Sequence, residues 1–251
     1  MKTHATSIKI VSLLAVLALL IGCGAGELMS VEKIRNASRN DVVTLGDYIF
    51  ALSGEESDFL HSLSGETFRR YAVSGAYMSG SFGGLAPDIL TQFSQAQSDD
   101  SNITTIIMDG GGNDILIPAT MFDPYNCKKN WWEWKLSNKC KNLINDVYVD
   151  TVNTLNELGR AGVENIVFQG YYHLKSGLIG SPTLNDAVDY GDTKLSQAVA
   201  NATLVDNHRV FVDPRGRLNT SSDIIYDGVH PSTSGSEKLA ELVWEELEGL
   251  L

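Results

Sequence analysis

The stretch that most constrains the fold is the apolar run at residues 42–45, which ends at Gly46-Asp47 and is followed by Tyr48. A run of Val, Thr and Leu without polar alternation predicts a strand buried on both faces, as in a parallel sheet. Gly46 and Asp47 then predict a turn at the carboxyl end of this strand. Because ligands of open α/β sheets collect at that end, the sequence places Tyr48 over a candidate active crevice.

Further strands and helices alternate along the chain. Short apolar runs predict strands, and amphipathic spacing that stops at glycines predicts helices. The expected strands are residues 42–45, 71–73, 103–108, 163–169 and 210–212, and the expected helices are residues 55–70, 143–158 and 236–250. Strands separated by helices require right-handed crossovers. The sequence therefore predicts an α/β fold, a three-layer αβα sandwich of the flavodoxin-like type with a mostly parallel five-stranded sheet, formed by residues 41–251.

The chain begins with a leader typical of export. Two lysines precede an apolar run at residues 10–21 that is too short to span a membrane as a helix. The run ends at Leu-Ile-Gly-Cys23, which resembles the lipobox of bacterial lipoproteins; an ordinary signal peptide that contains a cysteine is the alternative. The resemblance implies a signal peptide at residues 1–22 and a tether at residues 23–40. A lipidated Cys23 would then anchor the protein in the bacterial cell envelope, at the outer membrane and facing the periplasm.

Two cysteines remain in the expected mature domain. Cys127 and Cys140 form an even pair in an exported protein, which predicts a disulfide because the periplasm is oxidising. They belong to an insertion around residues 123–141 that holds three of the four tryptophans of the chain, together with several lysines. These tryptophans are Trp131, Trp132 and Trp134. Either the indoles cover part of the core, or they bind a sugar or an acyl chain of a substrate.

Charge and cysteine content exclude two classes of function. The net charge of −12 argues against nucleic acid as a partner, since binding to phosphates needs clustered lysine and arginine. Two cysteines without nearby histidines do not complete a tetrahedral metal site, so no metal is expected. No motif indicates a cofactor.

Four loops are expected at one edge of the sheet, because each follows the carboxyl end of a strand. They are Gly46-Asp47-Tyr48, Ser74-Gly75, Gly111-Gly112-Asn113-Asp114 and Asp227-Gly228-Val229-His230. Their order and spacing resemble the four sequence blocks of the SGNH hydrolases, also called the GDSL esterase and lipase family. The resemblance covers residues 42–245. It implies the fold of that family and action on ester bonds of acylated glycans or lipids.

The residue types in these blocks suit acyl transfer. Histidine is the side chain best suited to take up and return a proton at neutral pH, which makes His230 the candidate acid and base. Asp227, three residues earlier, can accept a hydrogen bond from the other ring nitrogen. The Asn113 side chain and the Gly75 backbone N–H would donate to an oxyanion, where one donor is commonly worth about 2.7 to 4 kcal/mol. The resemblance thus implies a catalytic pair, Asp227 and His230, and an oxyanion hole, Gly75 and Asn113.

The chain departs from the family at the nucleophile. Where the family has serine after Gly-Asp, this sequence has Tyr48. A tyrosine phenol has a pKa near 10, and its oxygen lies several ångströms farther from the backbone than a serine oxygen. Tyr48 is therefore expected to overshoot both His230 and the oxyanion donors, as they are arranged for serine.

Three accounts of the function remain open. In the first, the protein is an ester hydrolase with another nucleophile: Ser53, Ser74, Ser79 or a water activated by His230. In the second, it is a pseudoenzyme in which Tyr48 plugs or lines the pocket of a glycan- or ester-binding module. In the third, it is a structural protein of the envelope. The retained acid–base pair slightly favours hydrolysis, because a pure binding pocket does not need it.

Overall fold

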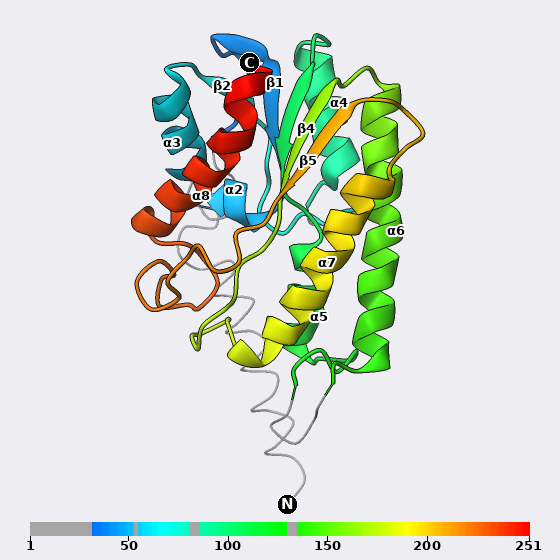
Figure 1. Cartoon of the computed structure of the whole chain (residues 1–251), viewed down its shortest axis with the longest axis vertical. Coiled ribbons are helices and arrows are strands. Elements are labelled where there is room, and N and C mark those ends of the chain that lie inside the picture. Colours follow the sequence, from blue (N-terminus) through cyan, green and yellow to red (C-terminus); the bar gives the residue numbers. More distant parts are fainter. Residues whose placement is uncertain (1–31, 53–54, 81–85, 130–134) are drawn as a thin grey trace, which may run out of the picture.

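The computed structural model describes residues 32–52, 55–80, 86–129 and 135–251 (Figure 1). Its strands form one sheet in the order β2-β1-β3-β4-β5. They are β1 (Arg39–Leu45), β2 (Phe68–Arg70), β3 (Thr105–Met108), β4 (Asn165–Gln169) and β5 (His208–Val212). All neighbouring strands of this sheet pair in parallel. The predicted α/β fold with a five-stranded sheet is confirmed.

Helices cover both faces of the sheet and complete the three layers (Figure 1). The helices that cover the sheet are α3 (Glu55–Ser64) and α8 (Thr233–Leu247) on one face, and α4 (Ile89–Asp99), α6 (Asn138–Arg160) and α7 (Asn185–Asn201) on the other. The remaining helices of the described residues are α2 (Tyr48–Leu52), α5 (Gly112–Met121), η1 (Pro182–Leu184) and η2 (Glu248–Leu250). The sheet is thus buried on both sides, as the unbroken apolar runs predicted.

Side chains that alternate along each strand divide the core into two clusters. In β3, Ile106 and Met108 pack in the cluster that includes side chains of α4, α6 and α7. Ile107, between them, packs in the cluster that includes side chains of α3 and α8. All three side chains are fully buried, which explains why this strand shows no polar alternation in the sequence.

The prediction for residues 55–73 was wrong in its second half. The sequence predicted a helix at residues 55–70 and a strand at residues 71–73. Helix α3 instead ends at Ser64, before Gly65 with its positive φ of 71°, and the strand is β2, immediately before the expected one. A glycine with positive φ is a common helix stop. Helices α2, α4, α5 and α7 were not predicted.

Arg69 explains why β2 is hard to recognise in the sequence. This arginine is fully buried in the middle of the strand. Its guanidinium donates hydrogen bonds to the carbonyl oxygens of Ala96 (2.8 Å) and Asp100 (3.1 Å), at the end of α4. The last carbonyls of a helix lack partners within the helix, and a cation there also opposes the helix dipole. Although an arginine in a sequence suggests an exposed position, Arg69 is buried and caps the end of α4.

The sheet edge is reached earlier in the chain than the sequence indicated. Ile34 forms an isolated bridge with Arg70, and β1 begins at Arg39. Contacts with the sheet therefore start within residues 23–40, the segment that the sequence assigned to the tether.

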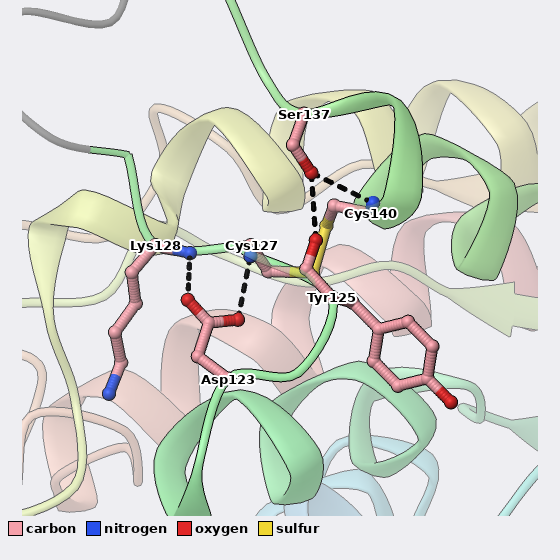
Figure 2. The surroundings of a disulfide bond; sticks show 6 residues. All are labelled: Asp123, Tyr125, Cys127, Lys128, Ser137 and Cys140. Carbon is pink, nitrogen blue, oxygen red and sulfur yellow. Dashed lines mark hydrogen bonds between the residues drawn. A yellow bond between two sulfur atoms is a disulfide. The ribbon is translucent and has the colours of Figure 1, made fainter.

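The predicted disulfide between Cys127 and Cys140 is present (Figure 2). It joins the segment after α5 to the first turn of α6. Ser137 caps α6 by accepting from the Cys140 N–H at 3.0 Å, while its hydroxyl donates to the carbonyl of Tyr125 at 2.7 Å. Asp123 accepts from the Cys127 N–H at 2.6 Å. The two ends of the insertion are thus fixed to each other by a covalent bond and by local hydrogen bonds.

Candidate active site

The candidate site lies at the carboxyl edge of the sheet, beside β1. The strand order reverses there, because β2 lies on one side of β1 and β3 on the other. Connections on the two sides leave in opposite directions, and the crevice between them is where ligands bind in such sheets. Tyr48 begins α2 just after β1, and Gly112 and Asn113 begin α5 just after β3. The fold therefore brings these two loops to the crevice.

Asp227 and His230 form the pair that the sequence predicted. Their carboxylate Oδ2 and imidazole Nδ1 are 2.5 Å apart. The other carboxylate oxygen of Asp227 accepts from the backbone N–H groups of Val229 (2.9 Å) and His230 (3.0 Å). Burial raises the pKa of Asp227, but the hydrogen bond and charge of His230 outweigh it and leave this pKa below its usual value. An ionised Asp227 thus holds Nδ1 as the donor and leaves Nε2 free to accept a proton.

The loop that carries this pair is held by the segment after β4. The N–H groups of Ile179 and Gly180 donate to the carbonyl of Asp227 at 2.9 and 2.8 Å. The hydroxyl of Tyr172 donates to the carbonyl of Val229 at 2.7 Å. Three hydrogen bonds from one neighbouring segment therefore position the acid–base pair.

Tyr48 occupies the nucleophile position as a buried ring. Only 6% of the residue is exposed. Its ring stands edge-on to the imidazole of His230, with centroids 5.4 Å apart and planes at 86°, and its centroid is 6.0 Å from that of Tyr171. No described residue forms a hydrogen bond with its hydroxyl. Burial raises the pKa of Tyr48 well above 10, and the nearby Tyr172 and Asp47 add to this shift. The phenol therefore stays protonated at neutral pH.

Beneath Tyr48, the turn Gly46-Asp47 is locked to the end of β3. The backbone N–H of Asp47 donates to Oδ1 of Asp109 at 2.7 Å. A Cβ on Gly46 would lie 1.8 Å from that same oxygen, so the close approach requires glycine. Burial raises the pKa of Asp47; burial and the charge of Asp47 raise that of Asp109 well above its usual value. The two carboxyl groups thus favour sharing a proton rather than carrying two charges.

Tyr171, two residues after the end of β4, connects this turn to the predicted oxyanion loop. Its hydroxyl donates to Oδ2 of Asp47 at 2.7 Å and accepts from the N–H of Gly112 at 2.8 Å. A Cβ on Gly112 would come within 2.5 Å of the Tyr171 ring. The phenol therefore fixes the turn that presents Asn113.

The two predicted oxyanion loops meet in the structure. The Asn113 side-chain N–H donates to the carbonyl of Ala76 at 3.0 Å, next to Gly75. The N–H of Met78 donates to Asp114 Oδ2, also at 3.0 Å, and burial raises the pKa of Asp114 to about 7. An amide nitrogen carries two hydrogens, so one donor of Asn113 is engaged here and one remains.

The architecture matches that of known ester hydrolases. A Slackia heliotrinireducens protein described as an SGNH hydrolase superposes with a TM-score of 0.54 at 16% identity, over 81% of this chain and 96% of that one. The lipase Lip_vut3 from a goat rumen metagenome gives 0.56 at 13% identity, over 81% and 95%. A carbohydrate esterase of family 3 from Talaromyces cellulolyticus gives 0.53 at 14% identity, over 83% and 96%. The chain has the SGNH hydrolase fold. No protein-family model and no curated protein matches the sequence.

Within this SGNH fold, several residues proposed from the sequence cannot be placed. Trp131, Trp132, Trp134, Cys23 and Ser53 lie outside the described residues. In the described part of the chain, no helix is both long and apolar enough to cross a membrane.

Ser74 and Ser79, proposed as substitute nucleophiles, lie within the described residues but form no hydrogen bond with His230. His173, in the segment after β4, pairs with Asp189 through an Nε2–Oδ1 contact of 2.8 Å. His230, by contrast, contacts the ring of Tyr48.

Sequence reasoning missed two residues of the candidate site. Asp109 and Tyr171 both bind the Gly46-Asp47 turn, and neither was proposed. A signal was present, because each is the first polar residue after a strand, Asp109 directly after β3 and Tyr171 one glycine after β4, just as Asp47 follows β1 after Gly46. Attention to the first polar residue after every predicted strand would have found both.

Proposed function

We propose that this protein is a lipid-anchored SGNH-type hydrolase of the bacterial envelope that cleaves ester bonds of acylated glycans or lipids, with water as the attacking group. The observation that carries the proposal is the Asp227–His230 contact of 2.5 Å beside the nucleophile position. A carboxylate that fixes the imidazole tautomer equips the opposite ring nitrogen to act as a base. The lipobox-like end of the leader at Cys23 supports the anchor.

The proposed reaction begins when His230 accepts a proton. Nε2 of His230 takes a proton from a water molecule while the water oxygen attacks the ester carbonyl carbon. The carbonyl oxygen gains the negative charge, which the free N–H of Asn113 and the N–H of Gly75 are suited to stabilise. The C–O bond then breaks, and the leaving alkoxide receives the proton from Nε2. Ester and water become acid and alcohol, and the acyl group never bonds to the protein.

The structure gives a reason to prefer water to the phenol of Tyr48. A phenol attacks as a phenolate, and burial keeps the pKa of Tyr48 well above 10. Its hydroxyl has no hydrogen bond to His230 that would remove the proton. Tyr48 is therefore a wall of the site in this proposal and not its nucleophile.

A binding module without catalysis is the second candidate. It is favoured by the ring of Tyr48, which packs against His230 at 5.4 Å and thereby limits the space beside the imidazole. The hydrogen bond from Asn113 to Ala76 adds to this account, because it engages one of the two oxyanion donors of the amide.

Hydrolysis of p-nitrophenyl acetate by four proteins tests the proposal. The wild type should show weak activity, Tyr48→Phe should retain it, and His230→Ala should lose it. Tyr48→Ser should gain activity by orders of magnitude, because a serine beside an intact histidine and oxyanion hole removes several kcal/mol from the barrier. Removing the ring also leaves a cavity, so the fold of Tyr48→Ser is checked by circular dichroism.

His173→Ala is the matched control, since His173 is also a histidine paired with an aspartate at 2.8 Å. It should hydrolyse the ester as the wild type does. If the wild type is inactive and Tyr48→Ser is active, the proposal is wrong and the protein is better described as a binding module. Loss of activity in Tyr48→Phe would show that the phenol itself attacks.

A further inference from the structure

A cavity of about 50 Å³ extends from the candidate site and is lined by residues of α5, α6 and α7. Most of its walls are apolar, and the helices contribute the aliphatic side chains Ile115, Leu116, Ile144, Val147 and Leu195. The rings of Tyr48 and Tyr171 complete the wall at the carboxyl edge of the sheet. A cavity with such walls favours an apolar occupant over water, because it offers water few hydrogen-bond partners.

Tyr48 places this cavity beside the acid–base pair. Its ring lines the cavity and also contacts the imidazole of His230 at a centroid distance of 5.4 Å. Gly112, which precedes the oxyanion donor Asn113, lines the cavity as well. Consider a ligand whose carbonyl group is held by Asn113 and attacked from the side of His230. The part of this ligand next to the carbonyl group is then the part that enters the cavity.

Gly191 shows that α7 leaves part of this space open. It lies inside the helix, is buried, and lines the cavity. A Cβ on Gly191 would meet no atom within 4 Å, the nearby backbone of its own helix aside. Glycine destabilises a helix interior relative to alanine, and no close contact requires glycine here. The empty position is thus room that packing has not filled.

We propose that the cavity holds the acyl chain of the ester, and that it selects short chains. This inference rests on the proposed function, because it assumes that the ligand carries an acyl group. One water-sized group needs about 10–15 Å³, so the volume of about 50 Å³ admits a chain of about three to five carbons. Carbons beyond this number reach past the cavity, so they gain no further burial there.

Binding of methyl ketones from butanone to 2-nonanone, measured by calorimetry, tests the cavity without any hydrolysis. Affinity should rise about fourfold for each methylene and then stop once the cavity is full, at about three to five carbons. Gly191→Ala should move this limit down by about one carbon without loss of thermal stability. Gly191→Leu should remove most of the rise.

Ala200→Leu is the control for size, because Ala200 is exposed on the same helix, and it should bind the series as the wild type does. His230→Ala should also keep the chain-length dependence, so an absence of esterase activity leaves this result intact. A wild type with no chain-length dependence overturns the cavity proposal even if esters are hydrolysed. If Gly191→Leu does not fold, Gly191→Ala decides the test: an unchanged chain-length limit in that variant also overturns the cavity proposal.

Discussion

Replacing Glu56 by glutamine should stabilise the protein relative to the wild type, strongly at neutral pH and hardly at all at acidic pH. Glu56 lies on α3 and is fully buried. Its carboxyl group accepts a hydrogen bond from the side-chain N–H of Gln169, whose nitrogen is 3.4 Å from Oε2. Burial raises the pKa of Glu56 from its ordinary value of 4.5 to about 8, and this hydrogen bond opposes the shift only in part. The folded protein therefore keeps Glu56 protonated at pH 7, whereas the unfolded chain ionises it.

The sign of the effect follows from proton linkage. Between pH 4.5 and about 8 the folded state binds more protons at Glu56 than the unfolded state does, so stability falls as the pH rises through this window. One pKa unit corresponds to about 1.4 kcal/mol, which gives a cost of about 3 kcal/mol at pH 7 and almost none at pH 4. Glutamine has nearly the same shape and never ionises, and its amide can still pair with that of Gln169.

Urea unfolding of the wild type and of Glu56→Gln at pH 4, 5.5, 7 and 8.5 measures this difference directly. The variant should gain stability progressively over the wild type, by about 3 kcal/mol at pH 7. Glu55→Gln is the matched control, because the neighbouring Glu55 is partly exposed and its replacement removes a carboxylate from the same helix turn. Parallel pH profiles for wild type and Glu56→Gln would refute the reasoning, as would a variant that is less stable at pH 8.5.

Two predictions concern the cysteines. Replacing Cys127 and Cys140 together by serine should lower stability by about 3 kcal/mol, the value that loop-closure entropy gives for a loop of similar length to this one, whose cysteines are 13 positions apart. Urea unfolding checks this, and an unchanged midpoint would show that the bond is absent or that its loop is ordered without it. The intact mass of protein extracted from bacterial membranes should match a chain that begins at an acylated Cys23. A mature chain with another first residue would disprove the anchor.

The sheet was predictable mainly where strands are buried on both faces. Residues 42–45 and 103–108 are unbroken apolar or β-branched runs; the first lies within β1, and the second contains β3. β2 escaped because Arg69 suggests an exposed residue, and only the carbonyls at the end of α4, distant in the sequence, give its guanidinium partners inside the protein. A local sequence pattern reveals that a residue is buried against a sheet face. It does not reveal a hydrogen bond to a helix that lies far away in the sequence.

The candidate site was predictable in its residue types and not in its contacts. The spacing of Asp227 and His230 suffices to bring them together, because both lie in one tight turn. The direction of the Tyr48 ring, toward His230 and Tyr171, depends on how three separate loops pack. The role of Tyr171 likewise depends on the register between β3 and β4, which no single segment of the sequence reveals.

The buried ring of Tyr48 also bears on how this chain can evolve. Codons for tyrosine and serine differ at a single base, so a serine at position 48 is always one point mutation away. Yet that mutation empties a space that the ring now fills against His230 and Tyr171. Removing a large buried side chain commonly destabilises a protein by about 3 to 5 kcal/mol, a large share of the stability of an ordinary domain. A lineage that carries Tyr48 would therefore return to serine only after other substitutions had refilled the space or added stability elsewhere.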